Sequence, residues 1–293
     1  MRRQAAATVV DLFRDDARVA VVLAEISVPY FAEAFRHDPQ RAVNVGIMEP
    51  AMVGVAAGFA MEGFHPVAST MASFMAERAY EQLKLDIGYQ GLGGTFIATG
   101  GAYDYSTEGA THQAPADIAL IGGIPGFQVL VPGHPREVDS LVRATYANGA
   151  PTYIRLSAQH NADAHPVGVG AAEVLRRGPA ATVVAVGPML DRTLAATDGL
   201  DVSVVYTASV EPFDAEVVAA TVGDDPVVIT VEPCYEGTLA RHVAAALTHV
   251  PHRHLSIGVP RRFWRSYGEP LDLDAGLGLD APGIRDRVLA ALG

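Results

Sequence analysis

Cysteine is almost missing from this sequence, which has a single one, Cys234, among 293 residues. An intramolecular disulfide is therefore impossible, and no cysteine cluster is available to bind zinc. We expect a reducing cytoplasm as the compartment. The N-terminal stretch MRRQAAATVVDLFRDD (1–16) lacks the continuous apolar core of a secretory leader. No apolar run is long enough to cross a bilayer, so we expect no membrane partner.

Positive charge is also scarce. The chain has 21 Lys and Arg against 33 Asp and Glu, which gives a net charge of −12. This balance argues against nucleic acid or an anionic membrane as the main partner. Charged residues make up 18% and hydrophobic residues 49% of the chain, so a folded globular protein is expected rather than a disordered one.

Several common signatures are missing as well. The sequence has no G-x-x-x-x-G-K-[ST] loop, and no G-x-G-x-x-G between a strand and a helix. It also has no H-E-x-x-H and no G-x-S-x-G elbow. Any chemistry must therefore come from side chains that are scattered along the chain.

Short runs rich in Val and Ile alternate with helical patterns, which is typical of a parallel sheet covered by helices on both faces. The expected strands of a first unit cover 19–26, 96–100, 127–132 and 151–156, with a helix over 134–149. Those of a second unit cover 181–186, 202–206, 227–231 and 254–259, with helices over 237–250 and 282–293. The polar stretch 157–180 is interpreted as a linker. We therefore predict two α/β domains, 1–165 and 175–293.

Glu49 stands at the edge of a run of small apolar residues in NVGIMEPAMVGVAAGFAMEG (44–63). Such a run indicates a tightly packed helix with no room for a hydrated charge. The simpler interpretation is a carboxylate at a helix start, where the helix dipole stabilises it. The alternative is a functional acid held in an apolar pocket.

Two further stretches hold candidate residues. The segment YSTEGATHQAPADIALIGGIPG (105–126) gathers Glu108 and His112 in one loop after an expected strand, and ligands of open α/β sheets bind at such carboxyl ends. The segment ASTMASFMAERAYEQLKLDIGYQ (68–90) places Phe74, Ala79, Leu83 and Ile87 on one helical face, where core packing is the default interpretation.

Together these stretches resemble the transketolase family. The order GIMEPAMVGVAAGFAMEG, STMASFMAERAYEQLKLDI and EGATHQAPADIALIGGIPG is similar to the pyrimidine-binding domain, and GPAATVVAVGPM, VEPFD and VVITVEPC are similar to the C-terminal domain. The resemblance covers roughly residues 2–290. It implies two three-layer α/β/α domains, the pyrimidine-binding domain followed by the transketolase C-terminal domain.

The resemblance implies thiamine diphosphate as the cofactor. Glu49 matches the family's glutamate, whose carboxylate tunes the aminopyrimidine of the cofactor. Phe74 matches the aromatic residue that stacks on the pyrimidine, and Met71 would border it. His112 matches the histidine of the family's D-G-P-T-H-Q stretch, which contacts substrate oxygens and passes protons. Glu108 stands where the family has an aspartate, one methylene shorter, that contacts a substrate hydroxyl.

The family's G-D-G metal motif is missing from the sequence. Whole transketolases carry it in an N-terminal domain, where it holds the diphosphate through a divalent ion. This chain therefore resembles the C-terminal subunit of a split transketolase. The resemblance implies a partner subunit that holds Mg²⁺ (or Ca²⁺) and the diphosphate, a heterotetramer as the assembly, and no activity without the partner. No metal ligand is assigned to this chain.

Some positions depart from the family pattern. Gly100 replaces a histidine, Ala158 replaces an arginine that binds a sugar phosphate, and Glu25 lies near the site in place of a small polar loop. Arg2 matches a possible phosphate-binding arginine, whereas Arg155 is expected to be structural. These losses argue against ordinary pentulose phosphates. They favour a specialised enzyme that transfers a two-carbon ketol or acyl unit between small molecules.

Three alternatives stay open. One is the β-subunit of a 2-oxo acid dehydrogenase or a decarboxylating acyloin synthase, which shares the fold and a glutamate like Glu49. Another is a fragment of a 1-deoxyxylulose-phosphate synthase, which RAYEQLKLDI resembles. The third, from a different class, is a non-catalytic regulatory subunit. In the second domain we expect Cys234, His242 and the basic stretch 259–269 to be structural or to contact the partner.

Overall fold

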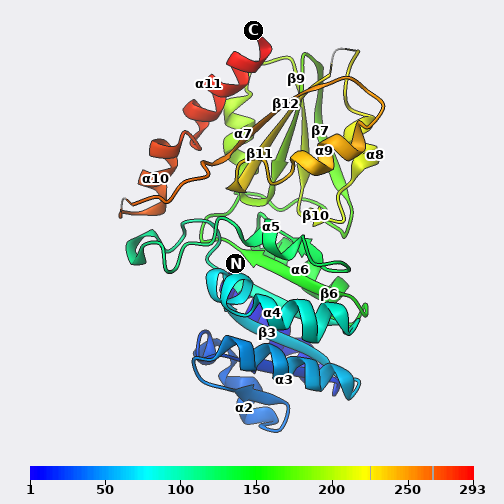
Figure 1. Ribbon diagram of the computed structural model, residues 1–293, viewed down its shortest axis with the longest axis vertical. Helices are drawn as coiled ribbons and strands as arrows, with labels where there is room; N and C mark the ends of the chain where they lie inside the picture. Colours follow the sequence, from blue (N-terminus) through cyan, green and yellow to red (C-terminus); the bar gives the residue numbers. More distant parts are fainter. Residues whose placement is uncertain (225, 266) are drawn as a thin grey trace.

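The protein is described by a computed structural model that covers residues 1–224, 226–265 and 267–293. Ser266, within the basic stretch 259–269, lies outside the described residues, as does Asp225. Two sheets stand one beyond the other along the long axis, the first in the blue-to-green half and the second in the green-to-red half (Figure 1). Among the described residues, no helix has the length and apolar character needed to cross a membrane.

The first sheet has seven strands in the order β10-β5-β6-β4-β3-β1-β2, all parallel except β10. Its strands are β1 (Val19–Leu23), β2 (Ala42–Asn44), β3 (His65–Met71), β4 (Gly94–Thr99), β5 (Gln128–Leu130), β6 (Pro151–Leu156) and β10 (Ser209–Glu211). Its helices are α1 (Arg2–Asp15), α2 (Ala32–His37), α3 (Glu49–Met61), α4 (Tyr80–Gln82), α5 (Asp117–Ile121) and α6 (Pro135–Thr145). Short 3₁₀ turns cover Val28–Phe31 and Ser106–Glu108, and π-helical turns cover Phe74–Arg78 and Leu83–Tyr89.

Successive strand residues point to opposite faces of the sheet, and each face has its own core. Val22 and Phe96 face α3, the π-helical turns and α5. Val21 and Ile97 face α1, α2 and α6. Both faces are therefore buried, which explains why β1, VAVVL, is a continuous apolar run rather than an alternating one.

The second sheet has the order β12-β11-β8-β9-β7 and is parallel except for β7. Its strands are β7 (Ala172–Pro179), β8 (Thr182–Val186), β9 (Val202–Thr207), β11 (Val227–Tyr235) and β12 (Arg253–Val259). Its helices are α7 (Leu190–Ala196), α8 (Ala215–Ala219), α9 (Ala240–Ala246), α10 (Pro270–Leu277) and α11 (Ala281–Leu292), with a 3₁₀ turn over Gly187–Met189. The predicted α/β class, with helices on both faces of a mainly parallel sheet, is confirmed in both halves.

The structure corrects three sequence expectations. The stretch 157–180 is not all linker, because its second part forms the edge strand β7. The central strand β3 occupies the start of the segment expected to be helical. Finally, β10 lies in the C-terminal half of the chain but pairs antiparallel with β5 of the first sheet, so the two halves share a sheet.

An ion pair is buried inside the first unit. Arg155 of β6 and Asp117 of α5 are both fully buried, and the Arg155 Nε atom lies 3.0 Å from Asp117 Oδ2. Tyr153 also donates a hydrogen bond of 2.8 Å to the same carboxylate oxygen. Arg155 therefore fixes α5, which follows the candidate loop, to the centre of the sheet.

Replacing Arg155 with Met should destabilise the chain strongly, because it leaves the Asp117 carboxylate buried without its cation. We expect a loss of about 3–5 kcal/mol in the free energy of unfolding, measured by urea denaturation. The matched control is Arg143→Met on the surface of α6, where we expect a change of about 1 kcal/mol or less. A loss at Arg155 no larger than that of the control would contradict this account of the pair.

Candidate active site

The candidate residues gather where the parallel strands of the first sheet end, at their carboxyl ends. The strands β1, β3, β4 and β6 are parallel, so their carboxyl ends lie side by side. Ligands of open α/β sheets bind at this edge. Met71 ends β3, and the segments that follow the strands carry the predicted site residues Glu25, Phe74, Gly100, Glu108 and His112.

Glu49 is the first residue of α3 and is fully buried. Two side chains reach its carboxylate. Arg78 Nη1 lies 2.7 Å from Oε2, and Thr70 donates a hydrogen bond of 3.4 Å to Oε1. Its place at the helix start lets the helix dipole favour the negative charge. Glu49 is thus a buried acid whose partners come from β3 and from the π-helical turn after it.

Phe74 begins the π-helical turn that follows β3 and lies between two other side chains. The Phe74 and His112 rings meet edge to face, with 5.2 Å between their centroids. The Arg78 guanidinium lies over the Phe74 ring, 4.1 Å from its centroid. The structure therefore brings together three predicted residues, Glu49, Phe74 and His112, with Arg78 between Glu49 and Phe74.

Sequence reasoning missed Arg78. Its signal was present, because Arg78 is the one arginine within 68–90 and follows Phe74 by four residues. Residues four apart lie close together on a helix, so a cation over the ring was a reasonable expectation. The core interpretation of the same helical face is confirmed for Ala79, Leu83 and Ile87, which are fully buried, whereas Phe74 is only partly buried.

His112 and Glu108 belong to a loop that follows β4. Glu108 ends a 3₁₀ turn and is exposed, and the Thr111 hydroxyl lies 2.8 Å from His112 Nδ1. An antiparallel bridge between Ala102 and Ala114 closes the base of the loop. The loop therefore exposes Glu108 and holds the half-buried His112 against the Phe74 ring.

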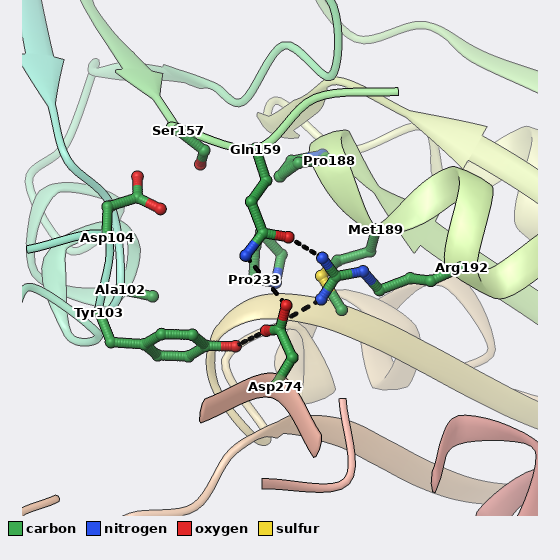
Figure 2. A pocket seen from close by; sticks show the side chains of 11 residues that line it. Ala102, Tyr103, Asp104, Ser157, Gln159, Pro188, Met189, Arg192, Pro233 and Asp274 are labelled. Atoms are coloured by element: carbon green, nitrogen blue, oxygen red, sulfur yellow. Dashed lines mark hydrogen bonds and ion pairs between the residues drawn. The ribbon is translucent and has the colours of Figure 1, made fainter. Parts of the chain in front are cut away.

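The second half of the chain anchors this loop. Figure 2 shows Tyr103 of the loop reaching Asp274 of α10, which also meets Arg192 of α7 and Gln159 after β6. Arg192 Nη1 lies 3.0 Å from Asp274 Oδ1, and Gln159 donates a hydrogen bond of 2.9 Å to Oδ2. Burial beside Asp274 raises the pKa of the Tyr103 hydroxyl, which therefore stays a donor. A cavity of about 30 Å³ beside the network has room for about one water molecule.

A larger cavity of about 190 Å³ lies over the ends of β4 and β6. Its lining holds Arg2, Thr99, Gly100, Asp104, Tyr105, Leu156, Ser157 and Ala158, together with Met1. Thr99 connects it with the buried acid, because the Thr99 hydroxyl donates a hydrogen bond of 3.4 Å to the carbonyl of Thr70, whose own hydroxyl meets Glu49. Gly100 and Ala158, the two positions where the family's basic side chains are lost, thus lie in one cavity.

Gly100 has no room for a side chain. Its φ of +80° favours glycine, and a Cβ atom there would overlap the Tyr105 ring. Arg2 is the one basic side chain among the residues that line the cavity, and it donates a hydrogen bond of 3.0 Å from Nε to Ser27 while stacking on Tyr30. Burial raises the pKa of Asp104, which faces the same cavity, to about 6.

The other predicted residues are placed as follows. Met71 ends β3 and is buried, next to the segment that carries Phe74. Glu25 is exposed after β1, with its carboxylate 2.9 Å from the side-chain nitrogen of Asn44. Cys234 is fully buried in β11, where desolvation raises its thiol pKa well above the usual range. Among the described residues, no three His, Cys, Asp or Glu side chains form a group that would hold a metal ion.

Comparison with known families matches residues 1–162 to the transketolase pyrimidine-binding domain and residues 170–284 to the transketolase C-terminal domain. An uncharacterized 33.6 kDa protein of the fasciation locus of Rhodococcoides fascians is 41% identical over 281 residues, covering 95% of this chain and 90% of that protein. One of the subunits of the apulose-4-phosphate transketolase of Actinobacillus succinogenes is 32% identical over 224 residues, covering 73% of this chain and 72% of that protein.

A 1-deoxy-D-xylulose-5-phosphate synthase of Bordetella petrii is 32% identical over 289 residues, which are 94% of this chain and 45% of that enzyme. The chain thus spans about half the length of that relative. Among solved structures, a split-gene transketolase described as an inactive β4 tetramer is 30% identical, with a TM-score of 0.85, and the alignment covers 99% of this chain and 97% of that one.

Asp104 should make the stability of this chain depend on pH. Its carboxyl pKa is about 6 in the folded chain, against an ordinary value of 3.8, so the folded state binds the proton more tightly. Stability should therefore fall as the pH rises from about 4 to 6, by up to about 3 kcal/mol. Asp104→Asn keeps an acceptor for the Ala158 N–H and removes the charge, so we expect a gain in the unfolding free energy at pH 8 but not at pH 4, measured by urea denaturation. Equal changes at both pH values would contradict the role of burial.

Proposed function

This chain belongs to the transketolase family, and we propose that it is one half of a two-subunit, thiamine diphosphate-dependent transferase that moves a two-carbon ketol or acyl unit. Homologues in the family use thiamine diphosphate. The observation that carries the proposal is the buried Glu49 carboxylate, which Arg78 connects to the Phe74 ring, with His112 in edge-to-face contact with that ring. These three residues provide an acid, a flat apolar surface and a polar group at the carboxyl ends of the strands of the first sheet.

The residues fit an aminopyrimidine. Its ring would lie against Phe74, and one of its ring nitrogens would share a proton with a Glu49 carboxylate oxygen. Burial suits Glu49 to this role, because a carboxylate shielded from water gains more by sharing a proton than by standing as a free ion. When bound, the cofactor supplies a nucleophilic carbon that takes up and releases the two-carbon unit. His112 would hold or move protons at substrate oxygens, and Glu108 would meet a substrate hydroxyl.

We propose that a partner subunit completes the site. It would carry the G-D-G motif, hold the diphosphate through Mg²⁺ (or Ca²⁺) and form a heterotetramer with this chain. Two observations support this: the motif is missing from the sequence, and the similar solved chain is described as a split-gene transketolase whose β4 tetramer is inactive. A reducing cytoplasm stays our prediction for the compartment, because the single cysteine is a buried free thiol.

The proposal is tested by titrating thiamine diphosphate and Mg²⁺ into this chain alone and into its complex with a co-encoded subunit that carries the G-D-G motif. We expect binding by the complex and none by the chain alone. Glu49→Gln, an isosteric change, should lower turnover by the complex at least about 100-fold, because it removes an acid on which proton transfer depends. An active Glu49→Gln complex would favour the non-catalytic alternative, and tight binding by the chain alone would refute the shared site.

The charges that line the cavity over β4 and β6 favour a substrate whose bound end carries no phosphate group. Arg2 is the one basic side chain in the lining of this cavity, which also holds Asp104, and exposed Glu25 follows β1, which β3 separates from β4. A phosphate carries a charge of about −1.5 to −2 at neutral pH, so it would meet one cationic side chain, Arg2, together with a carboxylate that is largely ionised above its pKa of about 6. We propose that an uncharged, hydroxylated end of the donor or acceptor lies here instead.

Ala158→Arg tests this preference in the assembled enzyme. A charge-assisted contact is worth about 1.5–3 kcal/mol, so kcat/KM for a pentulose phosphate should rise about 10- to 150-fold, with little change for the same pentulose without phosphate. Ala162→Arg, which adds the same charge at an exposed position outside the cavity lining, is the matched control. If the unmodified enzyme already uses the phosphorylated sugar more efficiently than the free one, the proposed preference is wrong.

A further inference from the structure

Arg78 makes two contacts at once. Its guanidinium donates to the Glu49 carboxylate at 2.7 Å, and its central carbon lies 4.1 Å from the centroid of the Phe74 ring. A guanidinium is flat, delocalised and cationic, so it suits an aromatic face and a carboxylate together. Arg78 thus occupies the surface between the buried acid and the aromatic ring.

These are the same two contacts that the proposed function assigns to an aminopyrimidine: a ring face on Phe74 and an N–H to Glu49. Two flat groups cannot lie on that face of Phe74 and take the same carboxylate oxygen at once. We propose that Arg78 is a displaceable counter-ion that covers the pyrimidine site in the free subunit and must leave it when thiamine diphosphate binds. This inference rests on the proposed function.

The surroundings of Glu49 explain why the free subunit needs a counter-ion. The carboxylate is fully buried, and the neutral hydroxyl of Thr70 reaches it only at a long 3.4 Å. An ionised carboxylate without a cation is costly in such a place. Arg78 supplies the positive charge that neutralises the carboxylate before the cofactor binds.

The position of Arg78 also lets it leave. Its side chain is 45% exposed, although its partner Glu49 is 0% exposed. It stands at the end of the π-helical turn Phe74–Arg78, and this long side chain reaches the acid from the solvent side. A rotation about its own side-chain bonds would carry the guanidinium into water, so the exchange needs no movement of α3 or of the sheet.

A displaceable counter-ion has opposite effects on two measurable quantities. Without Arg78, the free subunit loses the partner of a buried charge and should become less stable. The cofactor, in contrast, no longer competes with an internal group, so its apparent affinity should rise by the inverse of the fraction of open sites. A residue with a purely structural role would lower both quantities.

The test uses Arg78→Met, with Arg136→Met on the exposed face of α6 as the matched control. Thermal unfolding of this chain alone should show a lower Tm for Arg78→Met, and the loss should shrink when Glu49→Gln is also present. Calorimetric titration of thiamine diphosphate and Mg²⁺ into the complex with the partner subunit should show roughly tenfold tighter binding. The control should change neither quantity.

If Arg78→Met does not fold, Arg78→Lys replaces it, since an ammonium can neutralise Glu49 without covering the Phe74 ring. We expect near-normal stability and tighter cofactor binding for this variant. Unchanged or weaker binding by the variant, with normal binding by the unmodified complex, would overturn the inference about Arg78 alone. Absence of cofactor binding by the unmodified complex would instead refute the proposed function itself.

Discussion

Parallel pairing of β1, β3, β4 and β6 is the constraint on which the candidate site depends. It brings four carboxyl ends, and the segments that follow them, to one edge of the first sheet. Both faces of the sheet are covered by helices, so this edge is where polar side chains can gather without a core to exclude them. Glu49 is the exception, because its carboxylate is buried and must find its partners inside the protein.

Both halves of the chain contact the loop after β4. Tyr103 of this loop reaches Asp274 of α10, and the Ser106 hydroxyl donates to the carbonyl of Gly268. The β10 strand extends the first sheet from the C-terminal half. The second half therefore contacts the loop that carries Glu108 and His112 at two points.

Charge within the site is closely balanced in a chain that carries a net −12. Arg78 compensates Glu49, and Arg155 compensates Asp117, each pair joining a helix to the sheet or to the turn beside it. Arg2 and Asp104 both line the neighbouring cavity. This distribution of charge is the basis of the proposed preference for a substrate end without a phosphate group.

The amino-acid sequence alone determined the α/β class, most of the strands and the family. Short runs rich in β-branched residues such as VVAV and VVITV are typical of strands in a sheet that is covered on both faces, so hydrophobic pattern located β8 and β11. Pattern failed for β3, HPVASTM, where small and polar residues fill an almost entirely buried strand. It also failed for β7, an edge strand with partly exposed residues, and for the three-residue β10, because neither shows an apolar run.

Only the tertiary structure decided which candidate residues meet. Glu49 and Arg78 are far apart in sequence, and their pairing depends on how α3 and the turn after β3 pack on the sheet. The cavity that joins Gly100 with Ala158 depends likewise on the adjacency of β4 and β6. Residue type and spacing determine which elements form. The contacts between distant side chains depend on strand order and helix packing, which no local pattern encodes.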